Sequence, residues 1–233
     1  MNHENHMNKR SSRYQAALKD LDLEKIYPLQ QALELVKKSS TVKFDASVEV
    51  HFRLGIDPKQ SDQNVRFAAN LPHGTGKKKR VAAFVTAARE KEAKAAGADI
   101  VGGEELIKEI KQTEKIDFDV AVAEPAMMRN LAQIAKILGT KGKMPSPKTG
   151  TVTPDVAKAI AEIASGRVDA KSDDSGNLHQ IIGKVSFDLD ALKENFEVLL
   201  NALKTAKPKG AKQDFIRSVT VSSSMGPGLK VQI

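Results

Sequence analysis

Apolar and polar residues alternate without a break between residues 42 and 54. A period of two places all the apolar side chains on one face of an extended chain and the polar ones on the other. We therefore predict a long antiparallel strand over residues 42–54, with one face on a core and the other in water. The apolar positions are Val42, Phe44, Ala46, Val48, Val50, Phe52 and Leu54.

Similar patterns lie at both ends of the chain. Apolar residues at helical spacing predict one helix over residues 29–36, with Pro28 in its first turn, and another over residues 189–203. Further strands are predicted over 65–71, 181–187 and 215–221. Two helices and about four antiparallel strands form a complete two-layer α+β domain only if the two ends of the chain come together.

The middle of the chain follows a different pattern, in which short apolar strands alternate with helices. This alternation is typical of a parallel sheet that is covered on both faces, which predicts a three-layer, Rossmann-like α/β domain. We expect this domain to span residues 74–166 and to be inserted in an α+β domain made of residues 1–73 and 167–233. The predicted strands cover 80–85, 99–102 and 118–123, and the predicted helices 90–96, 104–111, 127–138 and 155–164.

Glycine and proline mark both connections between the two predicted domains. The first connection contains Gly74 and the second contains Gly166. Because the two thin connections lie at one place, we predict a hinge at these two glycines.

The composition narrows the class of partner. Lys and Arg number 37 against 29 Asp and Glu, so the 233 residues carry a net charge of +8, which favours a polyanion. The absence of Cys excludes disulfides, thiolate metal sites and cysteine nucleophiles. With no Trp and only ten Tyr and Phe, base stacking on an aromatic platform is poorly supported. Residues 1–9 resemble no signal peptide and no apolar run suits a membrane helix, so we expect no membrane and a cytoplasmic location.

The positive charge is unevenly distributed along the chain. Residues 63–89 and 125–154 contain no acidic residue, and after Val198 Asp214 is the single acid against six Lys and Arg. Residues 99–124 have eight acidic side chains against three lysines. Any one run is explained by a solvated surface, but three basic runs around an acidic one predict a basic face and an acidic face.

Two glycine-containing segments carry several cations each. Gly74-Thr75-Gly76-Lys77 lacks the first glycine and the hydroxyl residue of a Walker loop, and it lacks the third glycine of a dinucleotide loop. The basic loop 139–152 is equally compatible with an ordinary surface loop and with a polyanion contact. We treat the cations of both segments as auxiliary contacts to a phosphate backbone: Lys77, Lys78, Lys79, Arg80, Lys141, Lys143 and Lys148.

The sequence contains no coherent catalytic or metal-binding cluster. None of the five histidines has a partner at ligand spacing, and Asp173-Asp174-Ser175-Gly176-Asn177 lacks the acid spacing of a calcium loop. We therefore expect no enzymatic activity, no metal and no cofactor. Ser224-Met225-Gly226 is a weak signal by itself, although a Met and Phe44 on one basic surface could pack on a ribose or base.

Several motifs together are similar to those of the bacterial large-subunit ribosomal protein L-one family. They cover most of the chain after the first dozen residues and are specific as a set. The matching segments are residues 43–50, 54–66, 71–77, 144–152 and 224–227.

The resemblance implies a two-domain fold with a flexible double linker and no enzymatic activity. It also implies that the protein binds large-subunit rRNA as part of the large ribosomal subunit, forms the mobile stalk beside the tRNA exit site, helps release exit-site tRNA, and represses its own operon mRNA. The RNA contacts that it implies are Glu34, Lys43, Phe44, Arg217, Ser218, Ser224, Met225 and Gly226.

The chain departs from the family pattern at two places. Ser224 replaces the usual Thr and keeps its hydroxyl, whereas residues 139–144 differ from the usual Gly-Pro-Arg-Gly-Leu-Met, which leaves the role of that loop open. Two other function classes remain. A nucleotide-dependent enzyme could use the strand ends of the α/β domain, and a generic binder of acidic proteins or polyphosphate would show no preference among RNAs.

Overall fold

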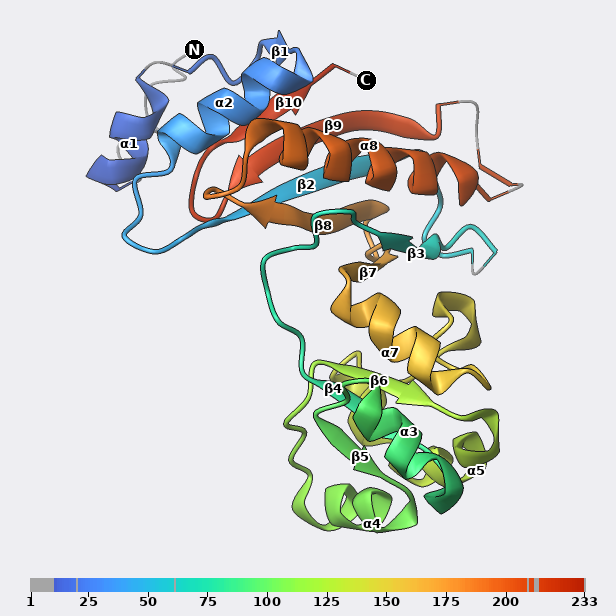
Figure 1. Ribbon diagram of the computed structural model, residues 1–233. Helices are drawn as coiled ribbons and strands as arrows, with labels where there is room; N and C mark the ends of the chain where they lie inside the picture. Colours follow the sequence, from blue (N-terminus) through green and yellow to red (C-terminus); the bar gives the residue numbers. More distant parts are fainter. Residues whose placement is uncertain (1–10, 20, 61, 209, 212–213, 233) are drawn as a thin grey trace. The chain divides into compact units, whose positions relative to one another are not determined.

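The computed structural model describes residues 11–232 except 20, 61, 209, 212 and 213. The chain forms two compact units, one made of residues 1–76 and 170–233 and the other of residues 77–169. These boundaries lie three residues after those expected from the sequence. Figure 1 shows the elements of each unit. The interpretation of residues 1–9 lies outside the described part of the chain.

A five-stranded sheet forms the centre of the discontinuous unit, in the order β1-β10-β9-β2-β8. β1 runs parallel to β10, and the other neighbours are antiparallel. A separate two-stranded sheet pairs β3 (Arg66–Asn70) with β7 (Arg167–Lys171). The strands of the main sheet are β1 (Ile26–Tyr27), β2 (Ser47–Leu54), β8 (Asn177–Lys184), β9 (Ile216–Ser223) and β10 (Gly228–Val231).

Two helices, α2 (Leu29–Ser39) and α8 (Leu189–Thr205), cover one face of this sheet (Figure 1). The inward side chains of β2 meet those of the two helices in the core, where Phe52 stacks on Phe196 with ring centroids 6.3 Å apart. Burial of such side chains provides most of the favourable free energy of folding. A third helix, α1 (Ser12–Leu18), contributes no buried residue.

The prediction for the first strand was wrong at its N-terminal end. β2 begins at Ser47, so Lys43 and Phe44 lie in a bend before the strand. The ladder ends there because β8 stops at Lys184, opposite Ser47, and β9 stops at Ser223, opposite Val48. The alternation of residues 42–46 therefore continues past the last partner strand.

Several elements of this unit were missed or misplaced. The third strand spans Asn177–Lys184 rather than 181–187, and β9 is followed by a further strand, β10, for which the sequence gives no prediction. β1, β7 and α1 were not predicted. These elements are short and carry few apolar residues, so their periodicity is weak.

The second unit contains a three-stranded parallel sheet in the order β5-β4-β6. The prediction of mixed α/β content with a parallel sheet is confirmed. Its strands are β4 (Val81–Phe84), β5 (Ile100–Gly102) and β6 (Val120–Ala123), and its helices include α3 (Glu90–Ala95), α4 (Glu104–Thr113), α5 (Met128–Leu131), α6 (Ala135–Thr140) and α7 (Val156–Ala164).

Helices pack on both faces of the parallel sheet. One core joins Phe84 with Ile107 of α4 and Leu138 of α6, and the other joins Ala83 with Ile160 of α7. The helix predicted over 127–138 is broken into α5 and α6 by a 3₁₀ turn over Ala132–Ile134. The described part of the chain contains four short 3₁₀ turns: η2 (Ala87–Arg89), η3 (Pro125–Met127), η4 (Ala132–Ile134) and η5 (Pro147–Thr149).

Asn195 of α8 fixes the chain where it leaves the discontinuous unit. Its side chain is fully buried, accepts from the His73 amide at 3.2 Å, and donates to the carbonyl oxygens of Gly74 at 3.0 Å and Ile182 at 2.7 Å. Gly74 and Gly166 have φ values of +63° and +114°, where glycine is favoured. The proposed hinge at these glycines stays a prediction.

We expect Asn195→Ala to destabilise this unit by about 3 kcal/mol, because three hydrogen bonds are lost and buried polar groups remain unpaired. Both tyrosines of the chain, Tyr14 and Tyr27, belong to the same unit. Urea unfolding followed by tyrosine fluorescence therefore measures this unit selectively. Glu197→Ala, on the exposed side of α8, is the control and should change the stability by less than about 0.5 kcal/mol. Equal stabilities of the two variants would contradict the prediction.

Candidate RNA-binding surface

The pairing of β2 with β9 brings two of the predicted motifs together. Val48 lies opposite Ser223, so the segment before β2 and the segment after β9 leave the sheet at the same end. The Ser224 amide donates to the Ser47 carbonyl oxygen at 2.9 Å, and the Ser47 amide donates to Ser224 Oγ at 3.2 Å. Phe44 and Met225 therefore belong to neighbouring segments.

The loop after β9 holds Met225 in an unusual conformation. Met225 has a φ of +61°, which is rare for a residue other than glycine, and its side chain is 68% exposed. The Gly226 amide closes the turn by donating to the Ser223 carbonyl oxygen at 2.8 Å. Backbone strain of this kind is often found at functional sites, because the rest of the fold must maintain it.

Phe44 is also exposed, at 54%. The next residue, Asp45, is anchored: the Ser186 hydroxyl donates to its carboxylate at 2.8 Å, and Lys184 Nζ donates to its carbonyl oxygen at 3.1 Å. Phe44 thus projects from a fixed backbone. Within the described residues four large apolar side chains are exposed, and the other two are Leu23 and Ile26.

The structure divides the other predicted contacts. Lys43 is exposed beside Phe44, and Glu34 is partly buried in the middle of α2. Arg217 and Ser218 lie near the start of β9, and Arg217 is exposed. Six residues of strand, about 20 Å, separate Ser218 from Ser224. Arg217 and Ser218 therefore do not belong to one cluster with Met225.

Helix α1 adds residues to the site that the sequence analysis missed. Arg13, Tyr14 and Ala17 line a small cavity together with residues 39–42 and with Ser224, Met225 and Gly226. The sequence contains one signal for this helix, because serine is a favoured N-cap residue and Ser11 precedes it. In the structure the Ser11 side chain accepts from the Tyr14 amide at 3.3 Å. A cation and an aromatic ring thus lie beside the Met225 loop.

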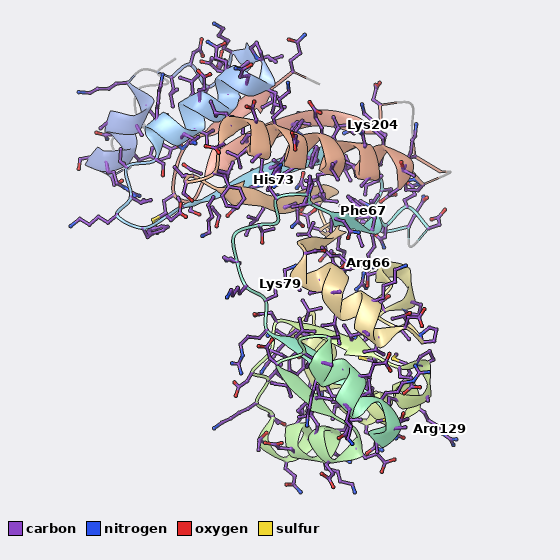
Figure 2. All side chains as sticks on the ribbon, viewed as in Figure 1. Arg66, Phe67, His73, Lys79, Arg129 and Lys204 are labelled. Atoms are coloured by element: carbon purple, nitrogen blue, oxygen red, sulfur yellow. The ribbon has the colours of Figure 1, made fainter. Side chains whose placement is uncertain are left out.

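The auxiliary basic residues belong to the second unit. Several of their ammonium groups donate hydrogen bonds to carbonyl oxygens of the same unit. Lys79, labelled in Figure 2, donates from Nζ to the Arg167 carbonyl oxygen at 2.7 Å. Burial lowers the pKa of Lys79 below its usual value, and the charges of Asp169 and Asp119 oppose this shift in part. A partly buried, bonded ammonium group is poorly available to a phosphate.

Two lysines of the loop 139–152 also donate to carbonyl oxygens of their own unit. Lys141 Nζ donates to the Glu114 carbonyl oxygen at 3.3 Å, and Lys143 donates to the Phe118 carbonyl oxygen and lies 5.8 Å from the centre of its ring. Lys77, Lys78 and Arg80 are exposed. The side chain of Lys148 lies outside the described part of the structure. RNA contact by any of these cations stays a prediction.

One cavity beside the parallel sheet is unsuited to a phosphate. It has a volume of about 670 Å³, lies at the carboxyl ends of β4 and β5, and is lined by four glutamates: Glu90, Glu104, Glu105 and Glu109. Like charges would repel a nucleotide there. In the described ranges no group of three or more His, Asp or Glu side chains is arranged to hold a metal ion. No helix in those ranges could cross a membrane.

Comparison with known proteins identifies a family of ribosomal proteins. The sequence profile of the ribosomal protein L1p/L10e family matches residues 36–227, and the chain belongs to this family. The resemblance seen in the sequence motifs is thereby confirmed. The family consists of structural ribosomal proteins rather than enzymes.

Three relatives are each called large ribosomal subunit protein uL1. The protein of Mycoplasma mycoides subsp. mycoides is 52% identical over 226 residues, which cover 97% of this chain and 100% of the relative. The proteins of Mycoplasma capricolum subsp. capricolum and Mesoplasma florum are each 51% identical, with the same two coverages.

We expect Gly226→Ala to destabilise the Met225 loop by about 1–3 kcal/mol, because an added Cβ would lie 2.3 Å from Ser223 Oγ. Ser223 is 3% exposed, and within the described structure its hydroxyl has no hydrogen-bond partner. Ser223→Ala should therefore be neutral or stabilising. It should also reduce the cost of Gly226→Ala in the double variant. Urea unfolding followed by tyrosine fluorescence measures all three, and strictly additive effects would argue against this contact.

Proposed function

We propose that this protein binds a folded segment of large-subunit rRNA through the surface around Phe44 and Met225. We call Lys43, Phe44, Ser224, Met225 and Gly226 the RNA-binding patch. The observation that carries the proposal is the exposure of two large apolar side chains, one of them on a strained backbone, at one end of a sheet in a ribosomal-protein fold.

The chemistry of the patch suits RNA. Apolar side chains without charge can pack on a ribose or on an unstacked base, and small residues let an RNA backbone approach closely. Ser224 can share its hydroxyl with a 2′-hydroxyl, a group that distinguishes RNA from DNA. Lys43 and Arg13 can neutralise phosphates at the edge of the patch.

In the cell we infer that the protein is part of the large ribosomal subunit in the cytoplasm. There it would form the mobile stalk beside the tRNA exit site and assist the release of exit-site tRNA. A hinge at Gly74 and Gly166 would let the inserted α/β domain move while the patch stays bound. We also propose that the protein represses its own operon by binding an mRNA segment that mimics the rRNA site. These roles rest on the family resemblance and on the names of the relatives.

The primary test is a titration with a transcript of the stalk region of large-subunit rRNA at several salt concentrations. We expect binding that weakens with salt, because phosphate contacts release counterions, and a clear preference over a generic duplex. Equal affinity for both RNAs would instead identify a generic polyanion binder. Footprinting on the rRNA and on the operon mRNA in parallel tests repression.

We expect Phe44→Ala and Met225→Ala each to weaken binding of the rRNA transcript by about 1–3 kcal/mol, the range for a side chain that stacks on a base. Leu23→Ala removes an exposed apolar side chain outside the patch and should leave the affinity unchanged. Tyrosine fluorescence checks that each variant is folded. Full affinity in both patch variants would show that the patch is not the RNA site.

Arg13→Ala should weaken binding at low salt and reduce the slope of log affinity against log salt by about 1, because one phosphate contact is lost. Lys19→Ala is the matched control, since Lys19 is exposed at the end of α1 and does not line the cavity beside Met225. An equal loss of slope in the two variants would mean that α1 acts through its general charge alone.

A further inference from the structure

Helices α2 and α8 cover one face of the main sheet (Figure 1). On the opposite face the strand register places polar residues in rows. Strand register places His51 of β2 between His179 of β8 and Thr220 of β9, and Thr220 is next to Lys230 of β10. One row thus crosses four strands. In the next row, two residues further along β2, Arg53 lies between Asn177 and Ser218.

Most ionisable side chains on this face are either cations or histidines, which become cations when they are protonated. Arg53 and Lys230 are exposed, and His179 is exposed beside the partly buried His51. Glu49 is an acidic residue on the same side of β2 and is partly buried. Hydroxyl and amide groups lie between the cations, as expected for a surface that contacts phosphates and sugars.

The two histidines form a directed chain of hydrogen bonds. His51 Nδ1 lies 2.8 Å from His179 Nδ1, His51 Nε2 lies 2.9 Å from Ser222 Oγ, and His179 Nε2 lies 3.5 Å from a carboxylate oxygen of Asp173. One arrangement of protons satisfies every group while both rings are neutral. In it the Ser222 hydroxyl donates to His51, His51 donates to His179, and His179 points its N–H at Asp173.

This chain can accept one additional proton. If Nε2 of His51 is protonated, His51 donates both to His179 and to the Ser222 hydroxyl, and no bond is broken. A second additional proton would place two N–H groups against each other across 2.8 Å. The pair is therefore a group that changes between neutral and +1.

The surroundings set where this change occurs. Burial and then the charge of His179 lower the pKa of His51 below its ordinary value, while Glu49 raises it. Burial raises the pKa of Asp173, but hydrogen bonds from the amides of Asn177 and Ser175 lower it by more, so the net pKa lies below its ordinary value. Asp173 therefore stays ionised beside His179. The other charges on this face are Arg53, on the same strand as His51, and Lys230 of β10. Phosphates bound at those cations would favour the protonated pair.

We propose that the open sheet face around His51, Arg53 and Lys230 is a second RNA-contact surface that binds phosphates more tightly when the histidine pair is protonated. This inference rests on the proposed function and extends it. RNA is the occupant we commit to because the face complements a polyanion and because it is continuous with the RNA-binding patch, Ser222 being two residues from Ser224. An RNA strand that contacts Met225 can thus continue across the open face of the sheet.

The test compares binding of the rRNA transcript at about pH 7.5 and about pH 5.5, on either side of the ordinary His pKa. We expect the affinity of the wild-type protein to rise as the pH falls, by at most about tenfold per unit for one linked proton. His179→Gln should remove most of this rise. His73→Gln should keep it, since His73 pairs with Glu194 of α8 at 2.7 Å and not with the sheet face.

A second measurement uses cations instead of protons. Arg53→Ala should reduce the salt slope by about 1, whereas Lys204→Ala on the exposed side of α8 (Figure 2) should not. Circular dichroism at both pH values checks folding. This check matters because the lowered pKa of His51 means that the unfolded chain binds the proton more readily, so the free protein loses stability below about pH 6.5.

The outcomes separate this inference from the proposed function. If Met225→Ala weakens binding while His179→Gln and Arg53→Ala match the wild type in pH response and salt slope, the second surface is refuted and the patch stands. If the wild type shows no preference for the rRNA transcript, both fail. If poly-glutamate binds as tightly as the transcript and loses affinity equally in Arg53→Ala, the face belongs to acidic proteins and the inference is overturned.

Discussion

The antiparallel pairing of β2 with β9 is the constraint on which the rest of the discontinuous unit depends. It joins segments that are 177 positions apart at the bond between Ser47 and Ser224. Because α2 precedes β2 and α8 precedes β9, this pairing also brings both helices to one face of the sheet, where they share a core with Phe52. The same register places the Phe44 and Met225 segments at one end of the sheet, so the core and the RNA-binding patch have a common origin.

Closure of the discontinuous unit by its own pairing leaves residues 77–169 free to form a second core. Short segments build that core: three parallel strands and their helices follow one another along the chain. Two units with separate cores need only thin connections, and buried Asn195 holds the first of them to α8. Charge is divided in the same way. The second unit carries an acid-lined cavity and lysines that bond to its own carbonyl groups, whereas the proposed RNA contacts lie on the first unit.

Local periodicity explains which elements could be predicted. α2, α8 and the three parallel strands have regular apolar patterns that are properties of a few consecutive residues. The first strand was extended to residue 42 because alternation cannot show where the partner strands end. α1 and β10 were not predicted, because the formation of such short elements depends on contacts with distant segments. The family motifs indicated Phe44 and Met225, but no pattern indicated that Arg13 lies beside Met225 or that His51 faces His179.

The sequence by itself determined the excess of positive charge, the exclusion of cysteine chemistry, the mixed α/β content and the membership of a ribosomal-protein family. These are sums or local patterns, so the order of residues suffices. The tertiary structure decided which cations are engaged internally, as Lys79 is, and which apolar side chains remain exposed, as Met225 does. The rows on the open sheet face were decided there too. Such properties depend on strand register and burial, which arise only when distant segments pair and exclude water from the groups between them.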